Sequence, residues 1–172
     1  MIYREPWQKQ TGDILNASCC WCDRILSQDN GILFCQRCWR GSAGVRYPPR
    51  VLAVDDDLDS LLLISVSLES FGFPYVSLPE GLSMIPFLHQ YSAGLILLDA
   101  LLTDIDSQAL LQALRRDAVT QDIPIVAVTA LASASDRERL LSVGFNDYLS
   151  KPYQLNALRS VILKNLPKSS FP

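Results

Sequence analysis

Polar side chains stand at the ends of four short apolar runs in this sequence. Two of the runs end in acids, one ends in a hydroxyl and one ends in a lysine. The runs and their endings are Val51–Val54 with Asp55 and Asp56, Leu95–Leu98 with Asp99, Ile125–Val128 with Thr129, and Tyr148–Ser150 with Lys151 and Pro152. Apolar runs of this length are typical of strands that are buried on both faces of a parallel sheet.

The chemistry follows from where such strands end. In an open parallel sheet, ligands bind beyond the carboxyl ends of the strands, so these endings are predicted to meet in one pocket. Adjacent acids repel each other and require a cation, a lysine or solvent to offset their charge. Magnesium prefers oxygen ligands, and a carboxylate can accept a phosphoryl group. A lysine and a hydroxyl suit the oxygens of that group. The set therefore predicts a site for Mg²⁺ and a phosphoryl group.

The order of these residues resembles the receiver domain of two-component response regulators. The resemblance covers about Arg50 to Leu166 and rests on Asp55-Asp56, Asp99, Thr129 and Lys151-Pro152. It implies an α/β fold of the flavodoxin-like kind, in which a five-stranded parallel sheet of order 2-1-3-4-5 carries helices on both faces. Mg²⁺ is the cofactor that it implies. In this family the Lys-Pro peptide is usually cis.

The resemblance also implies a role for each matching residue. Asp99 would accept the phosphoryl group, while Asp55 and Asp56 would hold Mg²⁺ directly or through water. The remaining roles would be a metal ligand from the Leu101 backbone carbonyl, a switch hydroxyl at Thr129, a phosphate-pairing cation at Lys151 and a switch aromatic at Tyr148. Asp57 is predicted to cap a helix that starts near Leu58 instead.

The sequence departs from the family after Asp99. The family usually has a proline four residues after the acceptor and a glycine eight residues after it, where this chain has Thr103 and Ser107. The loop Ala100–Asp106 is therefore expected to take another path. Leu101 and Leu131 are apolar where the family often has polar residues, which predicts a phosphoryl lifetime that differs from the family norm.

Composition limits the classes of protein that fit. The 172 residues, 49% hydrophobic and 19% charged, suit one folded domain with room for a small second one. Residues 1–50 carry seven Lys/Arg and four Asp/Glu, a net +3, while residues 51–172 carry eight and fourteen, a net −6. The acidic part argues against nucleic-acid binding by the receiver, but the basic part leaves it open. No secretory signal and no run long enough to span a membrane occur, so a cytoplasmic protein is expected.

Four of the five cysteines form two closely spaced pairs. Cys19 and Cys22 are separated by twelve residues from Cys35 and Cys38, and Cys20 is left over. Asn30-Gly31 between the pairs predicts a hairpin turn. Two such pairs joined by a hairpin indicate a structural Zn²⁺ site of the zinc-ribbon kind. Disulfides, free thiols or an iron site are the alternatives.

The remaining pattern sets segments and helices. We expect five segments: an N-terminal arm (1–18), a zinc-ribbon-like module (19–40), a linker (41–49), the receiver domain (50–166) and a C-terminal tail (167–172). Within the receiver, an edge strand is predicted over Phe73–Leu78. Helices are predicted at about Leu58–Phe71, from Pro79 to Gln90 with a weakening Pro86, over Ser107–Asp117, from a Ser135-x-x-Glu138 capping box to Val143 with Gly144 after it, and from Leu155 to before Pro167.

These features predict a signalling protein that is not a dedicated enzyme. The expected function is a phosphorylation-dependent response regulator whose Asp99 receives a phosphoryl group from a histidine kinase or a phosphotransfer protein. A downstream protein would bind through the zinc module or through the fourth helix and last strand, and a homodimer stays open. The alternatives are a small transcriptional regulator whose zinc module binds nucleic acid, and a receiver scaffold that works without phosphorylation.

Overall fold

The structure is a computed structural model that describes residues 27–29, 32–34, 51–91 and 93–167. The chain divides into two units, residues 1–47 and residues 48–172, and each is described by itself. Within the described residues, none of the helices is both long and apolar enough to span a bilayer.

In the first unit, two short strands pair antiparallel. Strand β1 (Ser27–Asp29) lies beside β2 (Ile32–Phe34), with Asp29 opposite Ile32. This pairing agrees with the hairpin that the sequence predicted at Asn30-Gly31. The turn residues Asn30 and Gly31 lie outside the described residues, as do the predicted zinc ligands Cys19, Cys22, Cys35 and Cys38.

The second unit is built on a five-stranded parallel sheet. Its strands are β3 (Val51–Val54), β4 (Tyr75–Leu78), β5 (Leu95–Asp99), β6 (Ile125–Thr129) and β7 (Asp147–Ser150). They lie in the order β4-β3-β5-β6-β7, which is the predicted order 2-1-3-4-5. All five residues of β5 and of β6 are buried, as expected for strands that are covered on both faces.

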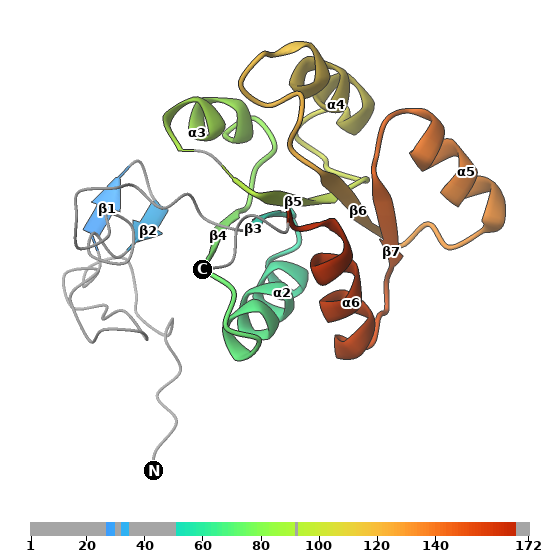
Figure 1. Ribbon diagram of the computed structural model, residues 1–172, viewed down its shortest axis with the longest axis horizontal. Coiled ribbons are helices and arrows are strands. Elements are labelled where there is room, and N and C mark those ends of the chain that lie inside the picture. Colours follow the sequence, from blue (N-terminus) through green and yellow to red (C-terminus); the bar gives the residue numbers. More distant parts are fainter. Residues whose placement is uncertain (1–26, 30–31, 35–50, 92, 168–172) are drawn as a thin grey trace. The chain divides into compact units, whose positions relative to one another are not determined.

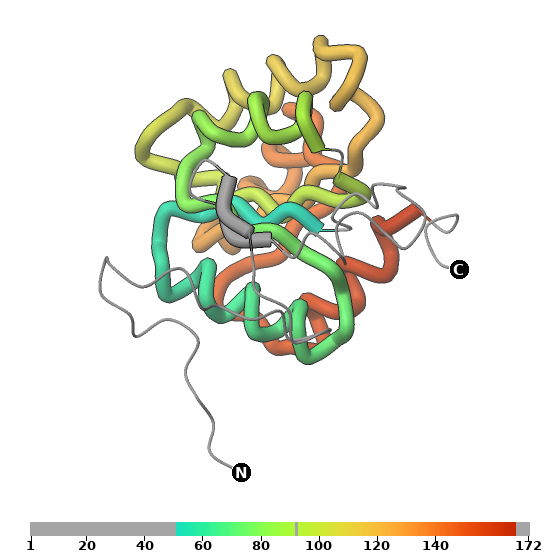
Figure 2. The backbone as a smooth tube through the Cα atoms, turned by 90° about the vertical axis from the view of Figure 1, so that its left-hand side faces the viewer, coloured from blue at the N-terminus to red at the C-terminus, as the bar shows by residue number. Residues whose placement is uncertain are grey.

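Helices cover both faces of this sheet. They are α2 (Leu58–Ser70), α3 (Met84–Gln90), α4 (Ser107–Arg116), α5 (Ala134–Ser142) and α6 (Leu155–Asn165). Helices α2 and α6 lie on one face, and α3, α4 and α5 lie on the other (Figure 1). The view turned by 90° shows the same layers, with α3 and α4 opposite α2 and α6 (Figure 2). Each strand-helix-strand step can therefore deliver its strand end to the same edge of the sheet.

The core follows the two-residue period of the strands. Alternate residues of β3, β5 and β6 meet the buried side of α2 and α6 in one cluster, which includes Val51, Ala53, Leu95, Leu97, Val126, Val128, Leu61, Ile64, Leu68, Leu158 and Ile162. Fully burying one such aliphatic side chain stabilises the fold by about 1.5–3 kcal/mol. On α2, Leu58, Leu63 and Val66 remain exposed, so the apolar surface of this helix is only partly used by its own sheet.

Helix starts agree with the predictions in one case and differ in another. Asp57 caps α2, because its carboxylate accepts from the Asp59 N–H and the Ser60 hydroxyl. The capping box of α5 is formed by Ser133 and Asp136, so the predicted pair Ser135 and Glu138 is wrong by two residues. The structure uses the earlier pair, in which the Ser133 hydroxyl accepts from the Asp136 N–H at 3.1 Å and Asp136 Oδ2 accepts from the Ser133 N–H at 3.3 Å.

Strand β4 and helix α3 each begin later than predicted. β4 begins at Tyr75 instead of Phe73, because the Phe73 N–H donates to the Leu68 carbonyl at 3.0 Å and Pro74 has no N–H. Helix α3 begins at Met84, which places Pro86 in its first turn, where a proline is tolerated. Gly144 follows α5 with φ of +117°, as predicted for a helix-ending glycine.

Candidate functional site

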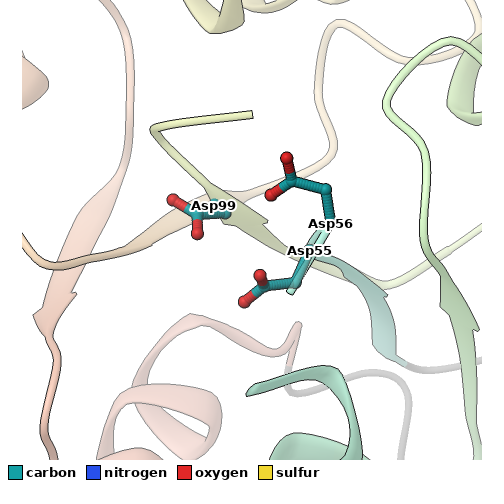
Figure 3. Close-up of side chains that lie close together, drawn as sticks. All are labelled: Asp55, Asp56 and Asp99. Carbon is teal, nitrogen blue, oxygen red and sulfur yellow. The ribbon is translucent and has the colours of Figure 1, made fainter. Parts of the chain in front are cut away.

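Strand register brings Asp55 and Asp99 together. Val54 pairs with Leu98 across β3 and β5, so the acid that follows Val54 lies beside the acid that ends β5. One carboxylate oxygen each from Asp55, Asp56 and Asp99 lie within 4.8 Å of one another. Figure 3 shows the three side chains gathered at the ends of these strands. Asp55 and Asp99 are buried, and Asp56 is half-buried.

Lys151 bonds to both buried acids. Its Nζ lies 2.7 Å from Asp55 Oδ2 and 2.8 Å from Asp99 Oδ2, and its side chain is 18% exposed. Burial opposes the charge of this lysine, but the bonds to Asp55 and Asp99 outweigh that effect and raise the pKa of Lys151. Burial raises the pKa of Asp55 above its ordinary value, although Lys151 acts against the rise. The lysine therefore holds two like charges together inside the fold.

The backbone around Lys151 places it at the acids. Its N–H donates to the Thr129 carbonyl at 2.7 Å, which joins the end of β7 to the end of β6. The Lys151-Pro152 peptide is cis, as the resemblance implied. Asp55 Oδ1 accepts from the Asp57 N–H at 3.1 Å, so both oxygens of Asp55 have a donor.

Asp56 is held by a residue from another loop. Its Oδ2 accepts from the Thr103 N–H at 3.0 Å and from the Thr103 hydroxyl at 2.5 Å. The bond from the hydroxyl is the main reason that the pKa of Asp56 lies below its ordinary value. A proline at this position could make neither bond, because it has no N–H and no hydroxyl.

The loop between β5 and α4 is tied at several further points. Asp99 Oδ1 accepts from the Leu101 N–H at 2.8 Å, and the buried Ser107 hydroxyl donates to the Asp99 carbonyl at 3.4 Å. Asp104 Oδ2 accepts from the Leu82 N–H at 2.9 Å. The loop also lies close over Gly81, where an added Cβ would meet side chains of Leu102 and Ile105 at 2.6–2.7 Å. A larger residue at position 81 would therefore require the side chains of Leu102 and Ile105 to move.

Thr129 and Tyr148 belong to the next two strands after β5 in the sheet, β6 and β7. Thr129 is fully buried at the end of β6, and its hydroxyl accepts from the Leu131 N–H at 3.2 Å. Tyr148 is half-buried on β7, and the guanidinium of Arg137 on α5 lies 5.4 Å from its ring centroid. A cation over the ring face attracts the aromatic side chain, so α5 and β7 are joined at this point.

Two residues of the site were not predicted from the sequence. Thr103 was noted only as a departure from the family, and its bond to Asp56 spans 47 positions. Tyr153 has a buried hydroxyl without a hydrogen-bond partner among the described residues, and burial raises its pKa to about 12. Neither feature has a local sequence signal, because each depends on which loops the fold brings together.

The donor set fits a magnesium ion. The group offers oxygens from three carboxylates within a small space. Three negative charges and the single positive charge of Lys151 leave a net charge of −2, which one divalent cation would neutralise. Hard oxygen ligands of this kind are those that Mg²⁺ prefers, and it needs only one or two carboxylates from a protein.

The comparisons with known proteins agree with this geometry. Residues 51–163 match the response regulator receiver domain family. The chain belongs to the response regulator receiver family. The sensor protein GacS of Pseudomonas syringae is 33% identical over 149 residues, which cover 83% of this chain and 16% of that protein. The DNA-binding dual master transcriptional regulator RpaA of Synechocystis is 34% identical over 110 residues, covering 64% of this chain and 46% of that protein.

Solved receiver structures have the same fold. The receiver domain of the sensor histidine kinase PA1611 from Pseudomonas aeruginosa has a TM-score of 0.63 at 27% identity, covering 69% of this chain and 98% of that domain. That structure has a magnesium ion coordinated in its active site cleft. The chemotaxis protein CheY4 of Vibrio cholerae, at 21% identity and a TM-score of 0.64, shares the fold over 70% of this chain and its own full length.

The receiver domain is one part of many of its relatives. The chain spans less than half the length of GacS and RpaA, and the parts of those proteins beyond the matched region have no counterpart in the alignment. This chain shares with its relatives the receiver fold, and it has an acidic cluster that is compatible with Mg²⁺.

Proposed function

We propose that this protein is a phosphorylation-dependent response regulator whose Asp99 accepts a phosphoryl group. The observation that carries the proposal is the cluster of Asp55, Asp56 and Asp99 with Lys151 bonded across two of them. The donor would be a phosphohistidine on a histidine kinase or on a phosphotransfer protein. Signalling is the purpose of this chemistry, so the protein is not proposed as a dedicated enzyme.

The transfer is an in-line displacement at phosphorus. One oxygen of the Asp99 carboxylate forms a bond to phosphorus, and the bond between phosphorus and the imidazole nitrogen breaks. The imidazole keeps the electron pair of that bond and then takes a proton. Bound Mg²⁺, held by Asp55, Asp56, Asp99 and the Leu101 carbonyl, would supply positive charge for the phosphoryl oxygens.

Lys151 and Thr129 would respond to the new group. Lys151 lies 2.8 Å from Asp99 Oδ2, so its ammonium can pair with a phosphoryl oxygen after a small movement. Thr129 ends the neighbouring strand, and its hydroxyl would turn from the Leu131 N–H to a phosphoryl oxygen. Tyr148 would then move inward, away from Arg137. The surface of α5 and β7 would have two states, and a downstream protein or a second copy of this chain would bind one of them.

Phosphoryl gain by the wild-type protein tests this function. The protein is incubated with Mg²⁺ and acetyl phosphate, and its intact mass is followed over time. We expect a single phosphoryl group to be added, and we expect its addition to stop when a chelator removes the divalent ion. If the wild-type protein gains no mass under these conditions and none from phosphorylated kinase domains, the phosphorylation-dependent function is excluded. A receiver scaffold that works without phosphorylation would then be the better account.

We also propose that residues 19–40 form a zinc-ribbon-like module. The cysteine spacing suggests it, and the paired strands β1 and β2 lie between the two cysteine pairs in the sequence. In this proposal, the arm 1–18 precedes the module, the linker 41–49 joins it to the receiver domain 50–166, and the tail 167–172 follows. The module would be a second surface for a downstream partner.

Zinc content tests the module. The wild-type protein is expected to bind one Zn²⁺ through Cys19, Cys22, Cys35 and Cys38, and Cys35→Ser is expected to lower the metal content to well below one ion per chain. Cys20→Ser is the matched control and should keep the ion. Elemental analysis of the purified proteins measures both. A folded, metal-free wild-type protein, or equal loss from Cys20→Ser, would contradict this assignment.

A further inference from the structure

Thr103 makes both of its polar contacts with one oxygen of Asp56. The N–H and the hydroxyl of Thr103 lie 3.0 and 2.5 Å from Asp56 Oδ2. At the same time, one oxygen of Asp56 lies within 4.8 Å of oxygens from Asp55 and Asp99. Asp56 is half-buried, so burial alone does not fix its side chain. The orientation of its carboxylate decides whether an oxygen can reach a metal ion.

The loop that carries Thr103 is itself anchored. Asp104, the next residue, accepts from the Leu82 N–H at 2.9 Å. Leu102 and Ile105 pack against Gly81 so closely that a Cβ there would overlap them. Thr103 therefore contacts Asp56 from a loop that is tied to the segment before α3, and its two donors restrict the carboxylate torsion before any ligand binds.

We propose that Thr103 is a positioning residue that orients Asp56 for Mg²⁺ binding, an inference that rests on the proposed function. Both Thr103 donors bind Asp56 Oδ2, which limits rotation of the carboxylate and leaves Asp56 Oδ1 without a bond to Thr103. A ligand that is already oriented loses less conformational freedom when the metal binds. Both hydrogen bonds described for Thr103 go to Asp56, and among the described residues none joins it to Asp99, so we expect it to act on metal affinity.

Thr103→Val is the direct test, because valine keeps the shape and the backbone N–H but loses the hydroxyl. We expect the Kd for Mg²⁺, measured by calorimetry on the full chain, to rise about 10-fold, the lower end of the range for loss of a side chain that supports a metal ligand. The rate of phosphoryl gain from acetyl phosphate at saturating Mg²⁺ should stay within about twofold, since only binding is weakened.

Two further variants separate positioning from general loosening of the loop. Thr103→Ser keeps the hydroxyl and should restore most of the Mg²⁺ affinity. Asp104→Ala removes one tie of the loop but keeps both Thr103 donors, and its Kd for Mg²⁺ should rise clearly less than that of Thr103→Val. Equal weakening in Asp104→Ala and Thr103→Val would overturn the inference in favour of loop order.

The remaining outcomes are also decisive. Unchanged or tighter Mg²⁺ binding in Thr103→Val would mean that the threonine does not support Asp56 or draws it away from the metal. A wild-type protein that binds Mg²⁺ but gains no phosphoryl group would end the proposed function, while the calorimetric comparison would still decide the role of Thr103. A wild-type protein that binds no Mg²⁺ would end both.

Discussion

Asp99→Asn is expected to lose phosphoryl gain from acetyl phosphate. The rate should fall at least about a thousandfold, because loss of a covalent nucleophile costs up to ~10⁶ in kcat in enzymes. Asparagine retains an oxygen that can accept a hydrogen bond from the Leu101 N–H. It also removes the negative charge that lies close to that of Asp55, so the fold should persist. Intact mass and melting temperature measure the two effects separately.

Asp57→Asn is the matched control for this variant. Asp57 adjoins the acidic pair in sequence, but its carboxylate caps α2, and asparagine is an equally good cap. The control should therefore gain the phosphoryl group at the wild-type rate. Phosphoryl gain that survives in Asp99→Asn and maps to another aspartate would show that the acceptor has been misassigned.

Lys151→Met is expected to lower the free energy of unfolding by about 3–5 kcal/mol at neutral pH, because it leaves buried charges without their partner. Methionine fills a similar volume, so the loss should come mainly from Asp55 and Asp99, whose Oδ2 atoms lie 2.7 and 2.8 Å from the lysine. Chemical denaturation in the absence of divalent ions measures the change. Added Mg²⁺ should return part of it, since it supplies positive charge at the same place.

The pH dependence of Lys151→Met has a definite sign. Burial already raises the folded-state pKa of Asp55 above its ordinary value of 3.8, and loss of the lysine raises it further. The folded state then holds a proton that the unfolded state has released, so the variant loses stability as pH rises through the folded pKa. The deficit should therefore be largest at neutral pH and shrink as pH falls toward 3.8. A deficit that grows on acidification would contradict this account.

Lys164→Met is the control for loss of a lysine. Lys164 also lies 2.7 Å from an aspartate, Asp147, but its side chain is 70% exposed. Asp147 also accepts from Asn165 and from the Tyr148 N–H. Because the lysine lies mostly in solvent and the buried Asp147 keeps two other donors, this variant should lose about 1 kcal/mol or less, well below the loss in Lys151→Met.

The parts of this protein that the sequence predicts are those with a local pattern. The common edge of the strand ends follows from the apolar runs and from the positions of Asp55, Asp99 and Lys151, whereas the strand order was implied by the resemblance to the receiver family. The cap at Asp57 and the glycine at Gly144 follow from backbone requirements within a few residues. These features need no knowledge of distant contacts, which is why they can be predicted.

Features that depend on distant contacts could not be predicted in this way. Arg115 donates to the carbonyls of Gln121, Ile123 and Gly144 and to the Asn146 side chain, yet its sequence context marks only an exposed position on a helix. The sequence offered Ser135 as a helix start, but the structure uses Ser133. The contact of Thr103 with Asp56 likewise requires that two loops meet. Such contacts are set by the tertiary structure. The local hydrophobic pattern and the helix or strand propensity of a residue do not say which distant residue it will contact.

The pairing of Val54 with Leu98 has a consequence for length changes within the strands. Successive side chains of a strand point to opposite faces, so deletion of one residue inside β5 would send Asp99 to the other face and away from Asp55. Substitutions along β5 can preserve the distance between the two acids, but a single-codon deletion cannot. This domain should therefore tolerate insertions and deletions in its surface loops far better than within β3 or β5.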